Sequence, residues 1–66
     1  MKNNIKVERA IKNLTQEQLA NAVSVSRQTI NAMEANKYVP STVLDLKIAR
    51  VFNKTVGDIF FLEKED

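Results

Sequence analysis

Residues 15–35, which read TQEQLANAVSVSRQTINAMEA, contain the strongest structural signals in the chain. They hold two residues of the kind that begin a helix, Thr15 and Ser26, because a hydroxyl oxygen can accept a hydrogen bond from a free backbone N–H. Gln18 lies three residues after Thr15, which completes the pattern of a capping box. Two helices are therefore predicted, over residues 16–23 and about 27–35, with three residues between them.

Small and apolar residues fall where these two helices must touch. Ala20 lets the second helix approach closely, and Val25 can fill the turn. Ile30 and Met33, at i, i+3 spacing, give the second helix an inner stripe. Two helices that are joined by a short turn and packed in this way form a helix-turn-helix.

The opposite face of the second helix is polar, small and uncharged at its middle. At about 100° per residue, it is occupied by Arg27, Gln28, Asn31, Ala32 and Ala35. In the major groove of DNA, amide side chains can bond adenine N6 and N7, arginine can bond guanine O6 and N7, and alanine can touch a thymine methyl. A face turned only to solvent more often carries pairs of lysine and glutamate, so the pattern favours base recognition.

The composition excludes several classes of protein. The chain has 66 residues and no Cys or His, which excludes disulfides, the usual zinc sites, Cys–His nucleophiles and Ser-His-Asp triads. We therefore expect no enzyme, no metal and no cofactor, and no small-molecule site is evident. The longest apolar run, residues 59–62, is far shorter than a membrane span, and no signal-peptide pattern opens the chain. A single cytoplasmic domain over residues 1–66 is expected.

Charge is divided unevenly along the chain. Residues 1–57 carry nine basic and four acidic side chains, a net charge of +5, whereas residues 58–66 carry −3. A basic body with an acidic end suits a polyanionic partner, with the acidic tail facing away from it. An ordinary solvated surface explains the mixed charge equally well.

Three more helices complete an all-α prediction. They are expected over about residues 4–12, ending at Asn13; from a cap at Ser41 or Thr42 to about Phe52; and in a last turn opened by Thr55 and Asp58 that carries Ile59, Phe60, Phe61 and Leu62.

Residues 16–20 (QEQLA), 25–34 (VSRQTINAME) and 36–41 (NKYVPS) resemble the Cro/CI-type (XRE-family) transcriptional regulators. The likeness covers nearly the whole chain and is closest to the short stand-alone subtype. It implies a five-helix, lambda-repressor-like domain that binds double-stranded DNA as a homodimer, generally as a repressor, with the third helix in the major groove. In some short relatives the tail pairs as a strand, here residues 61–65 with residues 2–6.

The resemblance also implies roles for individual residues. Arg27, Gln28, Asn31 and Ala32 would read bases. Gln16 would bond a phosphate and buttress Gln28, and Thr29, Asn36, Lys37 and Tyr38 would hold the DNA backbone. Arg9 and Glu34 match a structural ion pair of the family. Without the resemblance, Lys37 is equally well a solvated charge, and Tyr38 a residue at the edge of the core.

Four positions depart from the family pattern. Ser24 replaces the usual turn glycine and must adopt positive φ, which costs roughly 1 kcal/mol. Glu8 and Asp45 stand where leucine and alanine are usual, and both are expected to weaken the core. Gly57 lies inside the last helical turn, where it costs about 1 kcal/mol relative to alanine.

A dimer would read two half-sites of a palindromic operator, and a small chain gains stability from a partner. The predicted interface is the tail, residues 56–63, because its apolar side chains cannot all face inward from one turn: Val56, Ile59, Phe60, Phe61 and Leu62. The alternative is that these residues are simply core beneath the first helix. The alternative function is an antitoxin-like module that binds another protein.

Overall fold

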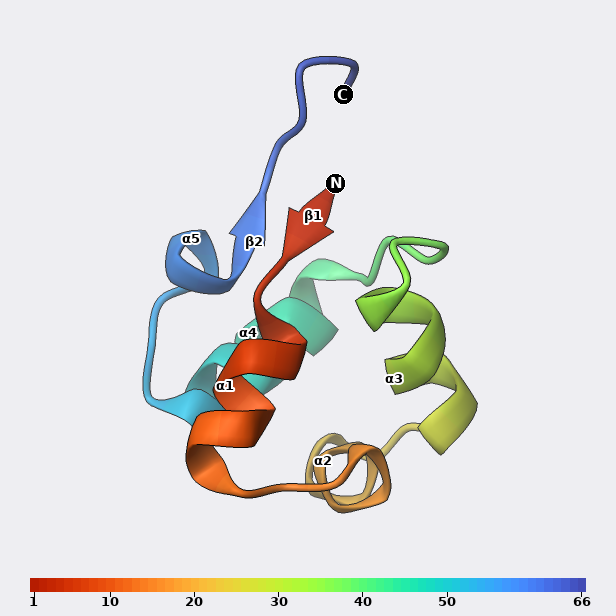
Figure 1. The fold of residues 1–66 in the computed structure, drawn as a ribbon, viewed down its shortest axis with the longest axis vertical. Helices are drawn as coiled ribbons and strands as arrows, with labels where there is room; N and C mark the ends of the chain where they lie inside the picture. Colours follow the sequence, from red (N-terminus) through yellow and green to blue (C-terminus); the bar gives the residue numbers. More distant parts are fainter.

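Five helices and a small antiparallel sheet make up the structure, a computed structural model that describes residues 1–66 (Figure 1). The helices are α1 (Ile5–Lys12), α2 (Gln16–Val23), α3 (Arg27–Glu34), α4 (Thr42–Phe52) and α5 (Val56–Ile59), and the strands are β1 (Lys2–Asn3) and β2 (Phe60–Phe61). The predicted five-helix fold is confirmed, and α2 has the predicted bounds. None of these helices has the length and apolar character needed to cross a membrane.

Hydroxyl side chains begin four of the helices. Thr15, Ser26, Ser41 and Thr55 each accept a hydrogen bond from the backbone N–H three residues on. The predicted capping box is present, since the Gln18 side chain accepts from the Thr15 backbone N–H at 2.8 Å. Three helices end at a residue in the left-handed conformation: Asn13, Ser24 and Asn53. The positive φ expected of Ser24 is 62°.

The end of the chain differs from the prediction of a longer last helical turn. The helix α5 stops at Ile59, and β2 pairs with β1 in the register Lys2 with Phe61 and Asn3 with Phe60. The predicted strand pair therefore exists, but it is shorter than 61–65 with 2–6, and Lys6 belongs to α1. Aromatic residues favour strands, and the Ile59 carbonyl accepts from the Asn4 N–H at 2.8 Å instead of continuing the helix.

Twelve buried apolar residues form one core to which all five helices contribute. Ile59 is fully buried in it and Phe60 is only 8% exposed. Both residues therefore pack within their own subunit, which corrects their assignment to a dimer interface. Val56 is partly buried against the same core, whereas Phe61 and Leu62 are 40% and 81% exposed.

The two acidic residues expected to weaken the core differ in their partners. Glu8 is buried, and its Oε2 lies 3.4 Å from the Lys54 Nζ, so its charge is paired. The Oδ1 of Asp45 is buried without any hydrogen-bond partner. Burial also raises the pKa of the Asp45 carboxyl. Asp45 is therefore a point of local instability in α4, and Glu8 is not.

Replacing Asp45 with alanine is expected to stabilise the protein at pH 7. Removing the unpaired oxygen should raise the free energy of unfolding by about 1 kcal/mol, which is roughly 4–8 °C in melting temperature for a domain of this size. The folded pKa lies above the unfolded value, so the penalty of the ionised carboxyl is present at neutral pH and is lost as the pH falls below about 4. Thermal melts of both proteins at pH 7 and pH 3 test this. The gain should shrink at pH 3, and a variant that melts below the parent at pH 7 contradicts the prediction.

Candidate nucleic-acid interface

Helix α3 turns one face into the core and the other to solvent. Ile30 and Met33 are fully buried, while Arg27, Gln28 and Asn31 on the opposite face are exposed. Neither Arg27 nor Gln28 makes a side-chain hydrogen bond to the rest of the protein. Ala32 is half-buried beside them and Ala35 is exposed. The outer face predicted from helical periodicity is therefore the face that this structure presents.

The turn between α2 and α3 fixes the angle between the two helices, and with it the direction in which α3 presents its exposed face. Ala20 is only 1% exposed beneath α3, and Val25 packs against the core from the turn. The Val25 N–H donates to the Ala20 carbonyl at 3.0 Å, closing α2 after the left-handed Ser24. Ala20 in α2, and Ser24 and Val25 in the turn, therefore lie where the sequence predicted them.

An ion pair joins α1 to the end of α3. Arg9 Nε donates to Glu34 Oε2 at 2.7 Å and Arg9 Nη2 to Glu34 Oε1 at 3.0 Å, a two-pronged contact. Arg9 Nη1 also donates to the Leu14 carbonyl at 2.8 Å. The side chains are only 16% and 8% exposed. The hydrogen bonds to Glu34 raise the pKa of the Arg9 guanidinium above its usual value, and this two-pronged contact ties α1 to the end of α3.

Gln16 extends this ion pair toward the exposed face. Its Nε2 donates to Glu34 Oε1 at 3.3 Å and to Asn31 Oδ1 at 3.2 Å. The buttressed side chain is therefore Asn31, which corrects the expectation that Gln16 supports Gln28. The reason is geometric, because Asn31 and Glu34 lie one turn apart on the side of α3 that faces the start of α2. The sequence carried no local signal for this contact.

The residues expected to hold the DNA backbone lie around the ends of α3. The Thr29 hydroxyl is half-buried and lies 3.0 Å from the Ser26 hydroxyl, so it is engaged within the helix start. Lys37 is exposed, and Tyr38 is 46% exposed. Asn36 has φ of 60° and accepts from Asn3 Nδ2 at 3.4 Å.

Asn3 is a positioning residue that the sequence analysis missed. Besides its contact with Asn36, its Nδ2 donates to the Met33 carbonyl at 2.7 Å. A residue of β1 thus gives a second donor to the Met33 carbonyl, which also accepts from the Asn36 N–H at 3.0 Å. The β1 strand therefore helps to fix the end of α3.

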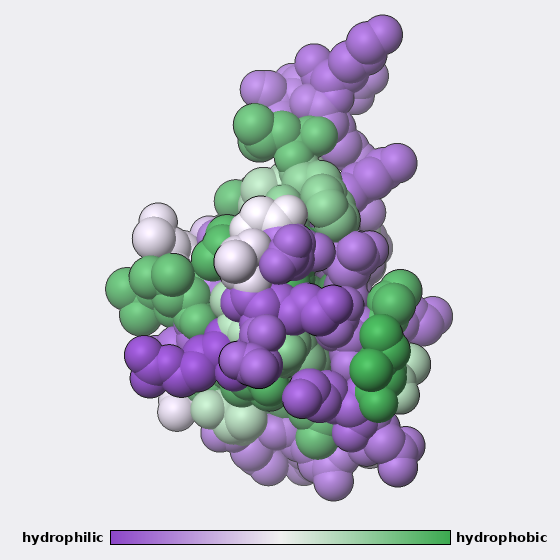
Figure 2. All heavy atoms as spheres, turned by 90° about the vertical axis from the view of Figure 1, so that its left-hand side faces the viewer, coloured by the Kyte–Doolittle hydropathy of each residue, from purple (hydrophilic) through white to green (hydrophobic).

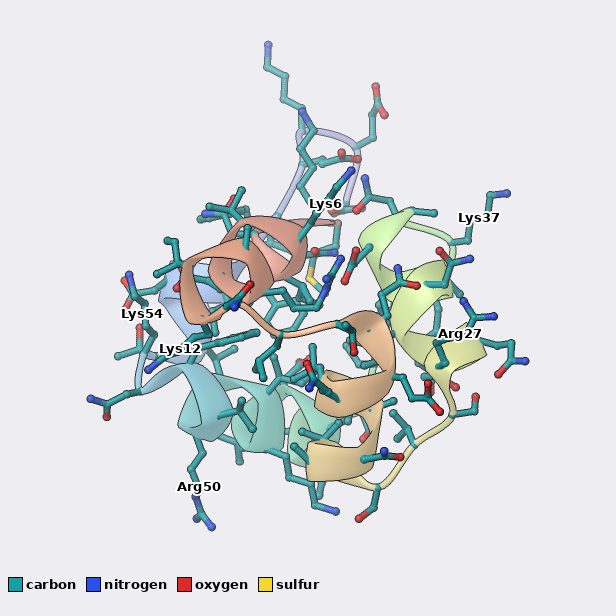
Figure 3. The ribbon with its side chains drawn as sticks, turned by 60° about the horizontal axis from the view of Figure 1, so that its bottom comes forward. Lys6, Lys12, Arg27, Lys37, Arg50 and Lys54 are labelled. Carbon is teal, nitrogen blue, oxygen red and sulfur yellow. The ribbon has the colours of Figure 1, made fainter.

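Cationic side chains lie beside the exposed face of α3. In Figure 3, Arg27 and Lys37 project from α3 and the loop after it, and Lys6 projects from α1. Lys12, Arg50 and Lys54 lie on the opposite side of this view. The acidic residue of α3, Glu34, is paired with Arg9. The surface around α3 therefore offers positive charge to an anionic partner.

The large exposed apolar residues of the helices lie outside α3. Figure 2 shows hydrophobic atoms in separate groups, with the hydrophilic end of the C-terminal segment projecting above them. The large exposed apolar residues of the helices are Val7 and Ile11 on α1 and Val43 and Leu46 on α4. In Figure 1 the C-terminal segment extends beyond β2, away from the α2–α3 turn. The acidic tail therefore does not cover the turn.

Comparison with known proteins gives matches along most or all of the chain. Residues 5–59 match the protein family described as Helix-turn-helix, HTH_3. The chain is 52% identical over 66 residues to an uncharacterized HTH-type transcriptional regulator of Methanocaldococcus jannaschii, and 46% identical over 66 residues to YgzD, one from Bacillus subtilis. Each of these alignments covers 100% of both chains.

A solved structure has the same fold. ClgR, the clp gene regulator from Corynebacterium glutamicum, superimposes with a TM-score of 0.76 at 26% sequence identity. The match covers 82% of this chain and 57% of the ClgR chain. The family match begins at the first residue of α1 and ends at the last residue of α5.

Proposed function

Since the chain belongs to the helix-turn-helix family HTH_3, we propose that it is a transcriptional regulator that represses by occupying a palindromic operator as a homodimer. Each subunit places α3 in the major groove. Arg27, Gln28, Asn31 and Ala32 meet base edges, while Lys37, Tyr38 and the helix start at Gln16 contact phosphates and set the register.

The observation that carries this proposal is the combination of a buried and an exposed face on one short helix. Ile30 and Met33 are fully buried, so α3 cannot rotate without breaking the core. Gln28 and Asn31 are then held outward, on a face whose large side chains are all polar. A helix that binds protein in a groove would instead present large apolar anchors.

The tail supports a dimer whose interface contains fewer residues than the sequence suggested. Phe61 and Leu62 remain exposed after folding, and Val56 is partly exposed nearby in the chain. Covering them with a second copy would bury apolar surface, which contributes about 25 cal/mol per Å². The interface we propose therefore contains Val56, Phe61 and Leu62, without Ile59 and Phe60.

Selection from random duplex DNA tests the function directly. The expected result is an enriched palindrome whose two equal halves are about one helical turn apart, about 10 base pairs centre to centre. Sedimentation of the complex should give two chains per duplex. Enrichment of a single unrepeated half would contradict the dimer, and no enrichment at low salt would contradict the function.

Replacing Gln28 with alanine is expected to weaken operator binding by about 1–3 kcal/mol, because a bidentate base contact is lost. The preference at one base pair of each half-site should relax, and binding to random DNA should hardly change. Lys37→Ala is the matched control, since it removes a phosphate contact and should weaken operator and random DNA alike. Competition titrations with both duplexes measure this. Equal losses on both duplexes for Gln28→Ala would contradict its assignment to a base.

A second role, holding another protein, is supported by exposed apolar residues outside α3. Val7 and Ile11 are 54% and 69% exposed on α1, and Val43 and Leu46 are 63% and 56% exposed on α4. These residues lie outside α3, so the two roles are compatible. A protein that co-purifies in stoichiometric amount and is lost on Val43→Asp substitution would support this role.

A further inference from the structure

Helix α3 ends in a Schellman motif, a turn in which two backbone N–H groups bond back to carbonyls of the last helical turn. The Lys37 N–H donates to the Ala32 carbonyl at 2.9 Å, and the Asn36 N–H donates to the Met33 carbonyl at 3.0 Å. Asn36 takes the left-handed position of the motif, with φ of 60°. This conformation is less favourable for asparagine than for glycine, so the turn gains from any contact that holds it in place.

The side chain of Asn3, on β1, bonds to this turn at two points. Its Nδ2 donates to the Met33 carbonyl at 2.7 Å and to the Asn36 Oδ1 at 3.4 Å. A carbonyl oxygen has two lone pairs, so Met33 can accept from Asn36 and Asn3 together. The Asn3 Oδ1 accepts from the Ile5 N–H at 3.1 Å. Since a backbone N–H only donates and a backbone carbonyl only accepts, these partners fix the direction in which the Asn3 amide faces.

The strand that carries Asn3 is itself held by the core. Asn3 is paired with Phe60 of β2, and the N–H of the next residue, Asn4, donates to the Ile59 carbonyl at 2.8 Å. Ile59 and Phe60 belong to the buried core. In Figure 1, β1 lies between β2 and the loop that follows α3. Asn3 therefore ties the turn at the end of α3 to the core through the strand pair.

The other left-handed helix ends lack such a contact. Asn13, Ser24 and Asn53 also have positive φ, but their side chains make no hydrogen bond within the protein. The end of α3 is also the one followed by Lys37 and Tyr38, which we propose for the DNA backbone. Lys37 is exposed and projects from this loop in Figure 3. A lysine ammonium sits on a flexible stem, so the region that it can reach depends on where the backbone of the loop is held.

We propose that Asn3 is a positioning residue for phosphate binding: by holding the turn at the end of α3 against β1, it places Lys37 and Tyr38 where the DNA backbone passes. This inference rests on the proposed function, because it assumes that the loop after α3 meets DNA. Asn3 carries no charge and acts through the loop. Because phosphate contacts carry no sequence information, it acts on operator and on random DNA alike.

Replacing Asn3 with serine tests the inference without a change of charge. The serine hydroxyl can still accept from the Ile5 N–H, as in an ST turn, but it is too short to bond Met33. Affinity for operator and for random duplex DNA should each fall about three-fold or more, near the lower end of couplings within one hydrogen-bond network. In a Lys37→Ala background the loss should be clearly smaller, because the contact that Asn3 positions is already absent. Fluorescence anisotropy titrations of the wild type, both single variants and the double variant complete this cycle.

Asn4→Ser is the matched control. It makes the same substitution one residue further on, at a side chain that does not cap α1 and makes no hydrogen bond within the protein. Both affinities should stay as in the wild type. Asn3→Thr, which also offers a short hydroxyl, replaces Asn3→Ser if circular dichroism shows that the serine variant is unfolded.

Hydrogen exchange of the free protein tests the tether without DNA. Exchange of the Asn36 and Lys37 N–H groups should become about three-fold faster or more in Asn3→Ser, while exchange of the buried Ile48 N–H in α4 should not change. Unchanged exchange at the turn, or an equal loss of affinity with and without Lys37, would overturn the inference. Absence of any duplex binding by the wild type at low salt would instead overturn the proposed function.

Discussion

Replacing Glu34 with alanine is expected to lower the free energy of unfolding by about 3 kcal/mol, near the lower end for breaking a buried ion pair. The loss is large because Arg9, only 16% exposed, keeps its charge with no carboxylate to receive it. For a domain of this size the melting temperature should fall by roughly 12–24 °C. Thermal and urea unfolding followed by circular dichroism measure both quantities.

The matched control for this substitution is Glu65→Ala, which removes an exposed carboxylate from the tail. Its effect should stay within about 0.5 kcal/mol. Replacing both partners, with Arg9→Met and Glu34→Leu together, should recover part of the loss because no buried charge remains. If Glu34→Ala melts within a few degrees of the parent, the ion pair does not hold α1 to α3 as described.

Raising the salt concentration from 50 to 200 mM is expected to weaken operator binding by about 250- to 1,000-fold. We expect each subunit to neutralise two or three phosphates with Arg27, Lys37 and a cation of α1 such as Lys6. For a dimer this corresponds to a slope of log K against log salt of about −4 to −5. Fluorescence anisotropy titrations of a labelled operator over a salt series give the slope.

Variants distinguish specific phosphate contacts from a general charge effect. Lys37→Ala removes one contact from each subunit and should reduce the magnitude of the slope by about 2 for the dimer. Arg50→Ala removes the same charge from the opposite side of the molecule in Figure 3 and should leave the slope unchanged. If the two variants change the slope equally, the DNA does not lie against α3.

Where structure depends on neighbours in the sequence, it could be predicted. The starts of α2 to α5 follow from hydroxyl caps that bond the backbone three residues on, and the outer face of α3 follows from the helical repeat. Ser24 adopts the left-handed conformation that the turn requires in spite of its side chain. These features need no knowledge of the rest of the chain.

Features that depend on distant partners could not be predicted in the same way. Whether Phe60 is core or interface depends on β1, almost the whole chain away, which pairs with β2. The Gln16 contact with Asn31 and Glu34 depends on how α2 and α3 cross. The resemblance had instead implied Gln28 as the partner of Gln16 and Arg9 as the partner of Glu34. The pairing of Glu8 with Lys54 likewise becomes visible only when α1 and α4 are packed.

The capped helix starts and left-handed helix ends have a consequence for how quickly the native state is reached. Chains dominated by contacts between near neighbours in sequence fold on a timescale of about microseconds to milliseconds, since little loop-closure entropy is lost before contacts form. The units α2 and α3 contain their own start and stop signals and should assemble early. The β1–β2 pair and the Glu8–Lys54 contact join residues far apart in the sequence and should close late. Substitutions there are therefore expected to accelerate unfolding more than they slow refolding.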